Sequence, residues 1–207
     1  MVVQDQWFGQ ADLSRLVPGA QFLNCRFEGL TLNHLDFEEC SFRACSFANA
    51  ALVGARLNGV RATACDFSNA RLPGANLFGA AFEECKFVGV DFTQVSTLLS
   101  ASFTRCNFAY GNWRGMNLSR MSFEGCSFVE ADLALSDLSK VSFLNADLSH
   151  AVLLEARFFQ TDLRGAALAG LDLRRVDLVG AIMTPSQLAY LAEVLGSAVA
   201  INLLFGI

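Results

Sequence analysis

Residues 131–150 read ADLAL SDLSK VSFLN ADLSH, which is four successive groups of five built on one pattern. The first position of each group is small or moderately apolar, and the third position is Leu or Phe. The same period runs through most of the chain, and a short internal repeat of this kind decides the whole fold.

The large residue recurs at every fifth position from Phe22 to Phe92 and, after one extra residue, from Leu98 to Leu178. Every member of these two series is Phe or Leu except Ala62 and Trp113. A helix repeats every 3.6 residues and a strand every 2, so neither would keep such a series on one face. A second series, two positions earlier, consists mainly of Ala and Cys. The sequence therefore predicts a repeat architecture with a five-residue unit.

This pattern resembles the pentapeptide-repeat family, whose unit is written A(D/N)LXX. Clear examples are Ala75-Asn76-Leu77, Ala131-Asp132-Leu133 and Ala146-Asp147-Leu148. The resemblance covers about residues 20–181. It implies an all-β fold, a right-handed quadrilateral parallel β-helix with about eight coils of four pentapeptides. It also implies that the first and third residues of each unit point inward and that the other three face solvent.

The cysteines test the square coil independently of the large residues. Cys25, Cys45, Cys65 and Cys85 recur at every fourth five-residue unit, and Cys106 and Cys126 continue the series after one step that is longer by a single residue. Four units make one coil, so we expect these thiols to stack at one corner as small, reduced packing residues. The extra residue between Phe92 and Leu98 is then a local bulge that leaves the faces aligned.

We predict three segments: an N-terminal cap (1–21), the β-helix (22–183) and a C-terminal helix with an apolar tail (184–207). Thr184 is a good N-cap, Pro185 suits the first helical position, and Gln187 completes a capping box. The apolar side chains of this segment predict a homodimer, because a monomer would leave them in water. The alternative is a cap folded onto its own last coil. The expected interface residues are Leu188, Leu191, Leu195, Ile201, Leu203, Leu204 and Phe205.

The composition argues against several other classes of function. His34 and His150 are the only histidines, and both occupy outward positions of the repeat, so we expect no enzyme and no catalytic, cofactor-binding or metal-binding residues. The net charge of −5 disfavours direct binding to nucleic acid. No uninterrupted apolar stretch reaches about 18 residues, which predicts no membrane span. The N-terminus lacks the features of a signal peptide, so a cytoplasmic location is expected.

The C-terminal part resembles one branch of the family more closely. Residues 171–178, LDLRRVDL, and 187–196, QLAYLAEVLG, are similar to the last coil and helix of the quinolone-resistance (Qnr-type) proteins. Asn112-Trp113 also resembles a tryptophan coil of that group. The resemblance implies a dimeric DNA mimic. Such a protein occupies the DNA site of DNA gyrase or topoisomerase IV and protects the enzyme from quinolone-type inhibitors or toxins.

The charges on the four faces of the predicted coil indicate where a basic partner would bind. Three faces carry balanced charges, whereas the second face, which begins at Phe27, has four acids against Arg26 and Lys86. Its expected partner-binding residues are Glu28, Asp66, Glu130 and Asp147. The alternative function is a generic protein–protein interaction scaffold of the pentapeptide-repeat family with an unknown partner.

Overall fold

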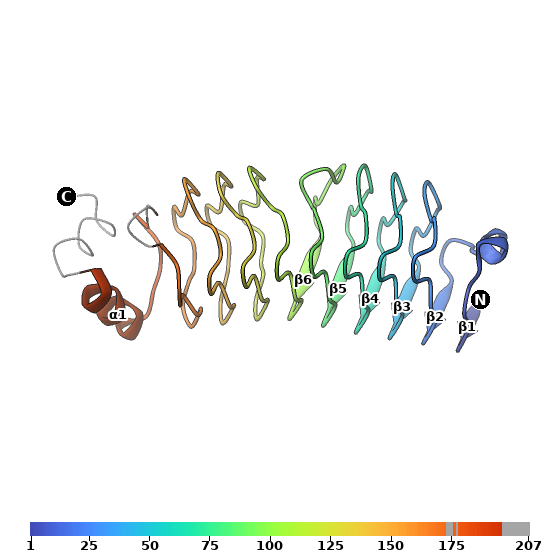
Figure 1. Ribbon diagram of the computed structural model, residues 1–207, viewed down its shortest axis with the longest axis horizontal. Helices are drawn as coiled ribbons and strands as arrows, with labels where there is room; N and C mark the ends of the chain where they lie inside the picture. The colour runs from blue at the N-terminus through green and yellow to red at the C-terminus, as the bar shows by residue number, and fades with distance from the viewer. Residues whose placement is uncertain (173–175, 177, 196–207) are drawn as a thin grey trace. The chain divides into compact units, whose positions relative to one another are not determined.

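The computed structural model describes residues 1–172, 176 and 178–195 (Figure 1). The chain divides into two compact units, unit 1 (Met1–Gly111) and unit 2 (Asn112–Ile207). In both units the chain winds as a right-handed, four-sided parallel β-helix, which confirms the predicted fold class.

One side of the unit 1 coil forms a six-stranded parallel sheet whose strands follow each other in chain order. Phe22 pairs with Phe42, four repeat units later, whereas Phe82 pairs with Phe103, one position beyond four units, so the extra residue lies within that coil. The other three sides pair through single bridges such as Arg26 with Ser46. The strands are β1 (Val2–Gln4), β2 (Gln21–Leu23), β3 (Ser41–Arg43), β4 (Arg61–Thr63), β5 (Ala81–Glu83) and β6 (Ser102–Thr104).

The residues expected to form an N-terminal cap, 1–21, already contribute to the coil. Val3 of β1 pairs with Phe22, and the ring of Phe8 stacks on that of Phe27 with 4.5 Å between centroids. A 3-10 helix, η1 (Gln10–Arg15), follows. The aromatic core therefore begins one rung earlier than the five-residue series indicated.

Most corners are tight turns that need a left-handed residue. At the corner after Phe47, the Ala50 N–H donates to the Phe47 carbonyl at 3.0 Å, and Asn49 has φ 59°. This combination is the signature of a type II turn, in which Gly and Asn adopt the positive φ at least cost. The corner explains why Gly and Asn recur two places after the large residue.

A polar side chain before the large residue fixes many of these corners. The Asp66 carboxylate accepts a hydrogen bond from the Ser68 N–H at 2.8 Å, and the Asn76 amide oxygen accepts one from the Phe78 N–H at 2.9 Å. These local bonds satisfy backbone donors that the ladder leaves over. The D/N position of the repeat therefore stabilises the corner that follows it.

The corners after β2–β5 are built differently, and they are the corners that carry the stacked cysteines. Among the described residues no turn hydrogen bond closes these four corners. Instead the Cys65 N–H donates to the Cys85 sulfur at 3.4 Å, and the Cys85 thiol donates to the Ala62 carbonyl at 3.4 Å. The Cys25 N–H bonds the Cys45 sulfur in the same way. Cysteine therefore forms hydrogen bonds with backbone groups at corners that no turn hydrogen bond closes, which we call open corners. Alanine cannot form these bonds.

The aromatic side chains in the interior of unit 1 are sorted by face. On the second face Phe27, Phe47 and Phe67 form a continuous stack with centroids 4.7 and 4.8 Å apart. First-face rings such as Phe42 meet this stack edge-on, 5.0 Å from Phe47 at 86°. Offset stacking along the coil and edge-to-face contacts across it are both favoured aromatic geometries.

Unit 2 continues the repeat and ends in a helix, α1 (Pro185–Leu195). Ser122, Ser142 and Asp162 bridge one after another, each at the same position of the next coil. The predicted capping box is present at the start of α1. The Gln187 side-chain oxygen accepts from the Thr184 N–H at 2.9 Å, and the Thr184 hydroxyl accepts from the Gln187 N–H at 3.3 Å.

Gln187 also joins α1 to the last coil, a contact that the capping signature alone did not predict. Its side-chain nitrogen donates to the Leu163 carbonyl at 2.7 Å and to the Ala166 carbonyl at 2.9 Å. These carbonyls lie where the ladder stops, so one side chain caps both the helix and the coil.

Cys85→Ala is expected to destabilise the protein more than Cys40→Ala. The first change leaves the Cys65 N–H unbonded in the core, at a cost of about 1–2 kcal/mol beyond the lost packing. Cys40 lies at a corner whose own N–H bonds the Phe37 carbonyl at 3.0 Å, so alanine suits it better. Urea unfolding of both variants measures the difference. Equal free energies of unfolding would contradict the role assigned to the open corners.

Gln187→Glu separates the two functions of this side chain. Glutamate can still accept the capping-box bond, but it cannot donate to the Leu163 and Ala166 carbonyls. We expect a loss of about 2 kcal/mol in the free energy of unfolding, no smaller than that of Gln187→Ala. Urea unfolding followed by circular dichroism tests this, and wild-type stability of Gln187→Glu would show that the contacts to the coil contribute nothing.

Candidate partner-binding surface

In unit 1 the predicted acids Glu28 and Asp66 lie on the outer side of the second face. The residues Arg26, Ser46, Asp66 and Lys86 bridge one after another along this face. The guanidinium of Arg26 sits over the Trp7 ring, 4.6 Å from its centroid, a cation–π contact. Neither Glu28 nor Asp66 makes an ion pair with any described residue.

In unit 2 the structure brings Glu130 and Asp147 together on the same face. The Glu130 N–H donates to the Ser149 carbonyl at 3.1 Å, and the Asp147 carboxylate accepts from the Ser149 N–H at 2.9 Å. Glu130 is exposed at a corner with φ 56°, and Asp147 is half-buried. The outward positions of this face hold no Lys or Arg from Ser127 to Gly170.

The aspartates and the glutamates of this face have different roles in the fold. Asp66 and Asp147 precede a large residue and cap a local N–H, so part of each carboxylate is committed to the corner. Glu28 and Glu130 follow a large residue, on the solvent side of the coil, and both are exposed. A partner would therefore meet the glutamates first.

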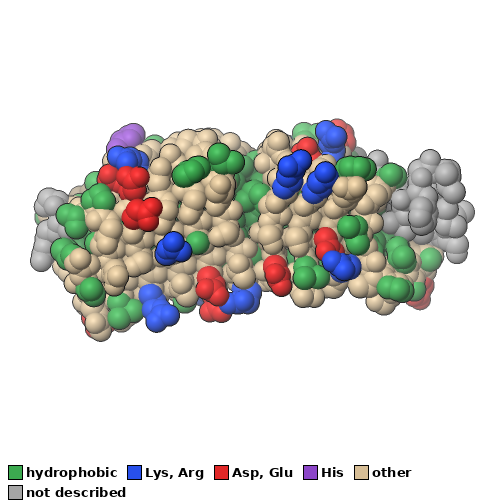
Figure 2. Space-filling view, turned by 180° about the vertical axis from the view of Figure 1, so that it is seen from behind, with side chains coloured by type: hydrophobic (Ala, Val, Ile, Leu, Met, Phe, Trp, Pro, Cys, Tyr) green, Lys and Arg blue, Asp and Glu red, His purple; other side chains and the backbone are tan. Residues whose placement is uncertain are grey.

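Acids on the other faces are largely neutralised by arginines one rung away. Arg105 pairs with Glu83 and Glu84, and Arg114 pairs with Asp132 at 3.2 Å. Arg56 similarly pairs with Asp36 at 3.2 Å. Figure 2 shows acidic and basic side chains interspersed on the side of the molecule that it draws. In the sequence, these pairs are visible as an Arg and an acid that lie about one coil apart. Counting the charges on each face does not reveal such pairs.

The residues expected at a dimer interface divide into three groups. Leu188 of α1 is 36% exposed, whereas Leu191 is 1% exposed and packs inside its own chain. Leu191 therefore has little surface left for a second copy. The side chain of Leu195 and the residues Ile201, Leu203, Leu204 and Phe205 lie outside the described residues.

All seven cysteines are buried, and none of them forms a disulfide bond. Burial raises the pKa of Cys25 and of Cys40. Hydrogen bonds with the thiols of Cys45 and Cys85, together with burial, raise the pKa of Cys65. The thiols of Cys25, Cys40 and Cys65 are therefore held protonated, and protonated, buried thiols are poor nucleophiles and poor metal ligands. Hydrogen bonds with the thiols of Cys65 and Cys106 lower the pKa of Cys45 and Cys85, respectively, but both of these thiols are buried. In the described part of the chain, no three His, Cys, Asp or Glu side chains are arranged to hold a metal ion.

The described helices also bear on membrane association. None of them combines the length and the apolarity that a membrane crossing requires.

Comparisons with solved structures show the same fold elsewhere. The chain is 22% identical to full-length QnrB1, described as a plasmid-mediated fluoroquinolone resistance protein, with a TM-score of 0.73. That match covers 94% of this chain and 97% of the other. A trypsin-treated variant of QnrB1 matches with a TM-score of 0.69 at 22% identity, over 95% and 97% of the two chains. A search of curated protein sequences finds no significant match.

Two sequence families of five-residue repeats match most of the chain. The "Pentapeptide repeat region" family matches residues 18–92. The "Pentapeptide repeats (8 copies)" family matches residues 101–139, 122–154 and 156–188. The first match begins just before the second rung of the coil, and the last match ends within α1. The protein is therefore a member of the pentapeptide-repeat family.

Proposed function

We propose that this protein is a non-enzymatic DNA mimic that binds DNA gyrase or topoisomerase IV and protects it from quinolone-type inhibitors or toxins. The observation that carries the proposal is the match of nearly the whole chain to the fold of QnrB1, a fluoroquinolone resistance protein. The Qnr-type features of residues 171–178 and 187–196 support the same function.

The second face is the proposed contact with the basic DNA-binding groove. Its acids Glu28, Asp66 and Asp147 have no ion-pair partner among the described residues, so their charge is available to an incoming protein. Complementary charge steers association and sets its salt dependence more than it sets the final affinity. A partner with a groove built for phosphates would be attracted to this face.

A generic interaction scaffold is the alternative, and the ion pairs of the other faces favour it. Arg56, Arg105 and Arg114 each neutralise acids that a DNA mimic would otherwise present. A scaffold needs only one specific surface, whereas a mimic of duplex DNA needs negative charge over a wide area. A gyrase assay separates the two functions.

Neutralising the second-face acids of unit 2 should weaken protection of gyrase. The double variant Glu130→Gln, Asp147→Asn keeps the local hydrogen bond of residue 147, because asparagine fills that role at Asn76. We expect about fivefold more protein to be needed for relief of quinolone inhibition in a supercoiling assay, since one exposed and one half-buried surface charge contribute about 1 kcal/mol together. Relief should also decline as salt rises.

The matched control is Asp132→Asn with Glu155→Gln, which removes two acids from the same repeat positions on the third face of unit 2. It should leave protection unchanged, and both variants should keep the wild-type circular-dichroism spectrum. If the wild-type protein relieves quinolone inhibition of neither gyrase nor topoisomerase IV, the result favours the scaffold function. If both variants weaken protection equally, the second face is not the contact.

We also propose that the protein is a homodimer held by α1 and the C-terminal tail. Leu188 and Tyr190 expose 36% and 41% of their surfaces on α1, and this apolar surface is open to a second copy of the chain. Light scattering should give about twice the chain mass of 22.4 kDa. Leu188→Asp should yield a folded monomer, whereas Leu191→Asp should disrupt the cap itself. A monomeric wild-type protein would refute the dimer.

A further inference from the structure

The outer side of the sheet in unit 1 carries positive charge without a negative counterpart on strands β1–β4. Arg43 of β3 and Arg61 of β4 point outward and are exposed, and β1 and β2 contain no charged residue. Neither arginine side chain makes a hydrogen bond or an ion pair with a described residue. This local excess is opposite in sign to the net charge of −5 of the whole chain.

The register of the sheet places the two arginines at opposite corners of a rectangle. Ser41 pairs with Arg61, and Arg43 pairs with Thr63. Because rungs lie about 4.8 Å apart and outward residues of one strand about 6.6 Å apart, the Cα atoms of the two arginines are separated by about 8 Å. The other two corners are hydroxyl side chains, which make no hydrogen bond with a described residue. All four side chains can therefore donate hydrogen bonds to one ligand.

The acids on the neighbouring rungs are bonded to other side chains. Glu83 of β5 and Glu84 at the following corner both pair with Arg105. Asp5, after β1, accepts a hydrogen bond from the Asn24 side-chain nitrogen at 2.7 Å. These acids therefore leave the two arginines of the rectangle without compensation.

Glu39 is the remaining acid close to the rectangle in the sequence, at the corner before β3. Its carboxylate lies over Gly59 of the next coil, in the space that a side chain of residue 59 would take. It makes no ion pair with a described residue. Glu39 thus occupies the corner rather than the outer side of the sheet.

A cavity of 340 Å³ lies over the rectangle, and we call it the basic cavity. Its volume falls within the range of about 300–1,000 Å³ that is usual for small-molecule sites. Val2 and Leu23 extend it toward β1 with apolar surface, and the described residues that line it include no acid and no histidine. Its other outward lining residues are Gln21, Ser41, Arg43, Arg61 and Thr63.

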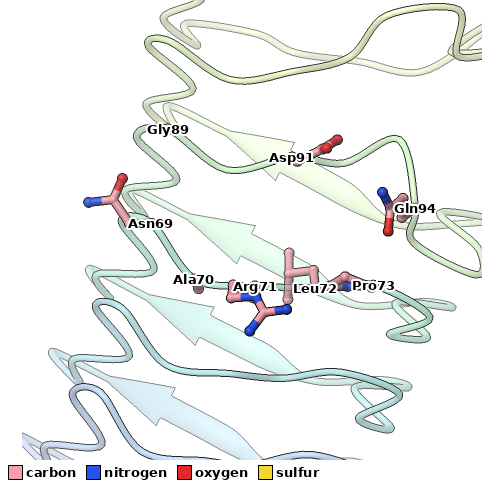
Figure 3. A pocket seen from close by; sticks show the side chains of 8 residues that line it. All are labelled: Asn69, Ala70, Arg71, Leu72, Pro73, Gly89, Asp91 and Gln94. Atoms are coloured by element: carbon pink, nitrogen blue, oxygen red, sulfur yellow. The ribbon is translucent and has the colours of Figure 1, made fainter.

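A second cavity of unit 1, of 310 Å³, also contains an arginine but differs in charge (Figure 3). Its lining includes Arg71 on one rung and Asp91 on the next. The positive charge is therefore balanced by an acid of the same cavity. The absence of such an acid distinguishes the basic cavity among the described lining residues.

The second cavity also marks the place where the ladder of unit 1 is interrupted. The bridge that the repeat would form between Arg71 and Asp91 is missing within the described residues. The extra residue of the longer coil causes this interruption, and the ladder resumes where the Ser96 N–H donates to the Ala75 carbonyl at 2.9 Å. Leu72 is 1% exposed, so the chain itself fills this unpaired rung.

The charge and the donors of the basic cavity define its ligand. Two guanidinium groups supply two positive charges and planar pairs of N–H donors, which match an oxyanion. A phosphate monoester carries a charge of about −1.5 to −2 at pH 7 and has three acceptor oxygens. A carboxylate or a phosphodiester carries a single charge and has two free oxygens. Only the monoester compensates both arginines and keeps an oxygen for a hydroxyl donor.

We propose that the basic cavity binds the phosphoryl group of a small phosphate monoester. Arg43 and Arg61 hold the phosphoryl oxygens from opposite corners, and Ser41 and Thr63 donate hydrogen bonds from the surface of the sheet. The organic part of the ligand lies over Leu23 and Val2. This site lies on the first face, so the proposal does not depend on the topoisomerase contact proposed for the second face.

The test follows the backbone amides and the arginine side-chain N–H signals of the full chain by NMR at constant ionic strength. We expect phenyl phosphate to cause saturable shifts at Ser41, Arg43, Arg61 and Thr63, with Kd of about 0.1–10 mM. Dimethyl phosphate and sodium acetate should bind about tenfold more weakly. The absence of a local shift would overturn the proposal. Equal affinity for dimethyl phosphate, or much tighter binding of a phosphoserine peptide, would also overturn it by indicating a nucleic acid or a protein ligand.

The pH dependence of phenyl phosphate binding tests which charge state is bound. The second pKa of a phosphate monoester is about 6, so the dianion predominates at pH 7.5 and the monoanion at pH 5. The described lining residues contain no group that titrates in this range, so the change originates in the ligand. We expect Kd to rise about tenfold from pH 7.5 to pH 5. A constant Kd would contradict recognition of the dianion.

Paired variants separate a site from a general effect of charge. Arg43→Gln with Arg61→Gln should abolish saturable binding of phenyl phosphate. The matched control is Arg71→Gln with Lys86→Gln, which removes the same charge from two exposed cations on other faces that pair with no described acid. It should keep the wild-type Kd. Equal losses in the two double variants would show that net charge governs binding.

Arg43→Lys tests the geometry of the donors at unchanged charge. Lysine keeps the positive charge but lacks the planar pair of N–H donors, so we expect Kd for phenyl phosphate to rise about fivefold. The backbone amide spectrum of each variant without ligand shows whether the fold is intact. A folded Arg43→Lys variant with the wild-type Kd would refute bidentate recognition by this arginine.

Discussion

The structure depends on closing each coil after a fixed length of chain, so that every backbone N–H and C=O meets the same position of the next coil. When Phe27, Phe47 and Phe67 stack at 4.7 and 4.8 Å, their spacing is that of the parallel ladder that holds them. The inward positions then have to match in size from coil to coil. The corners must turn through equal angles, and this explains why positive φ values recur two places after the large residue.

The same closure shows which features could be read from the sequence. A five-residue period predicts the coil, the inward Phe and Leu, and the cysteine stack, because each residue meets its own repeat. The capping box at Thr184 and Gln187 is equally local and was predicted from a single turn of sequence. Contacts that depend on side-chain conformation could not be predicted in this way. Gln187 reaching the Leu163 and Ala166 carbonyls is one example, and the burial of Leu191 is another.

The cysteines and the charges show how a periodic pattern conceals physical roles. Cys and Ala share one series, so the sequence suggests that they are interchangeable, yet Cys85 bonds the backbone of two earlier residues. Likewise Asp132 and Asp147 occupy the same repeat position and both cap a local N–H. Only Asp132 is neutralised, by Arg114 at 3.2 Å. The difference lies in which side chain the neighbouring rung supplies, and this distinguishes a purely structural acid from one available to a partner.

The unpaired rung has a consequence for how such a protein diversifies. If every rung of a coil is equivalent, the coil offers a partner no unique position at which to bind. The single residue at Ser96 breaks that equivalence and marks one position. Gaining or losing one whole coil on the N-terminal side would leave every remaining contact intact while moving the mark by one rung relative to the chain's start, about 4.8 Å. The number of coils thus sets the distance between the chain's start and this position in steps of one rung, without changing the residues at that position.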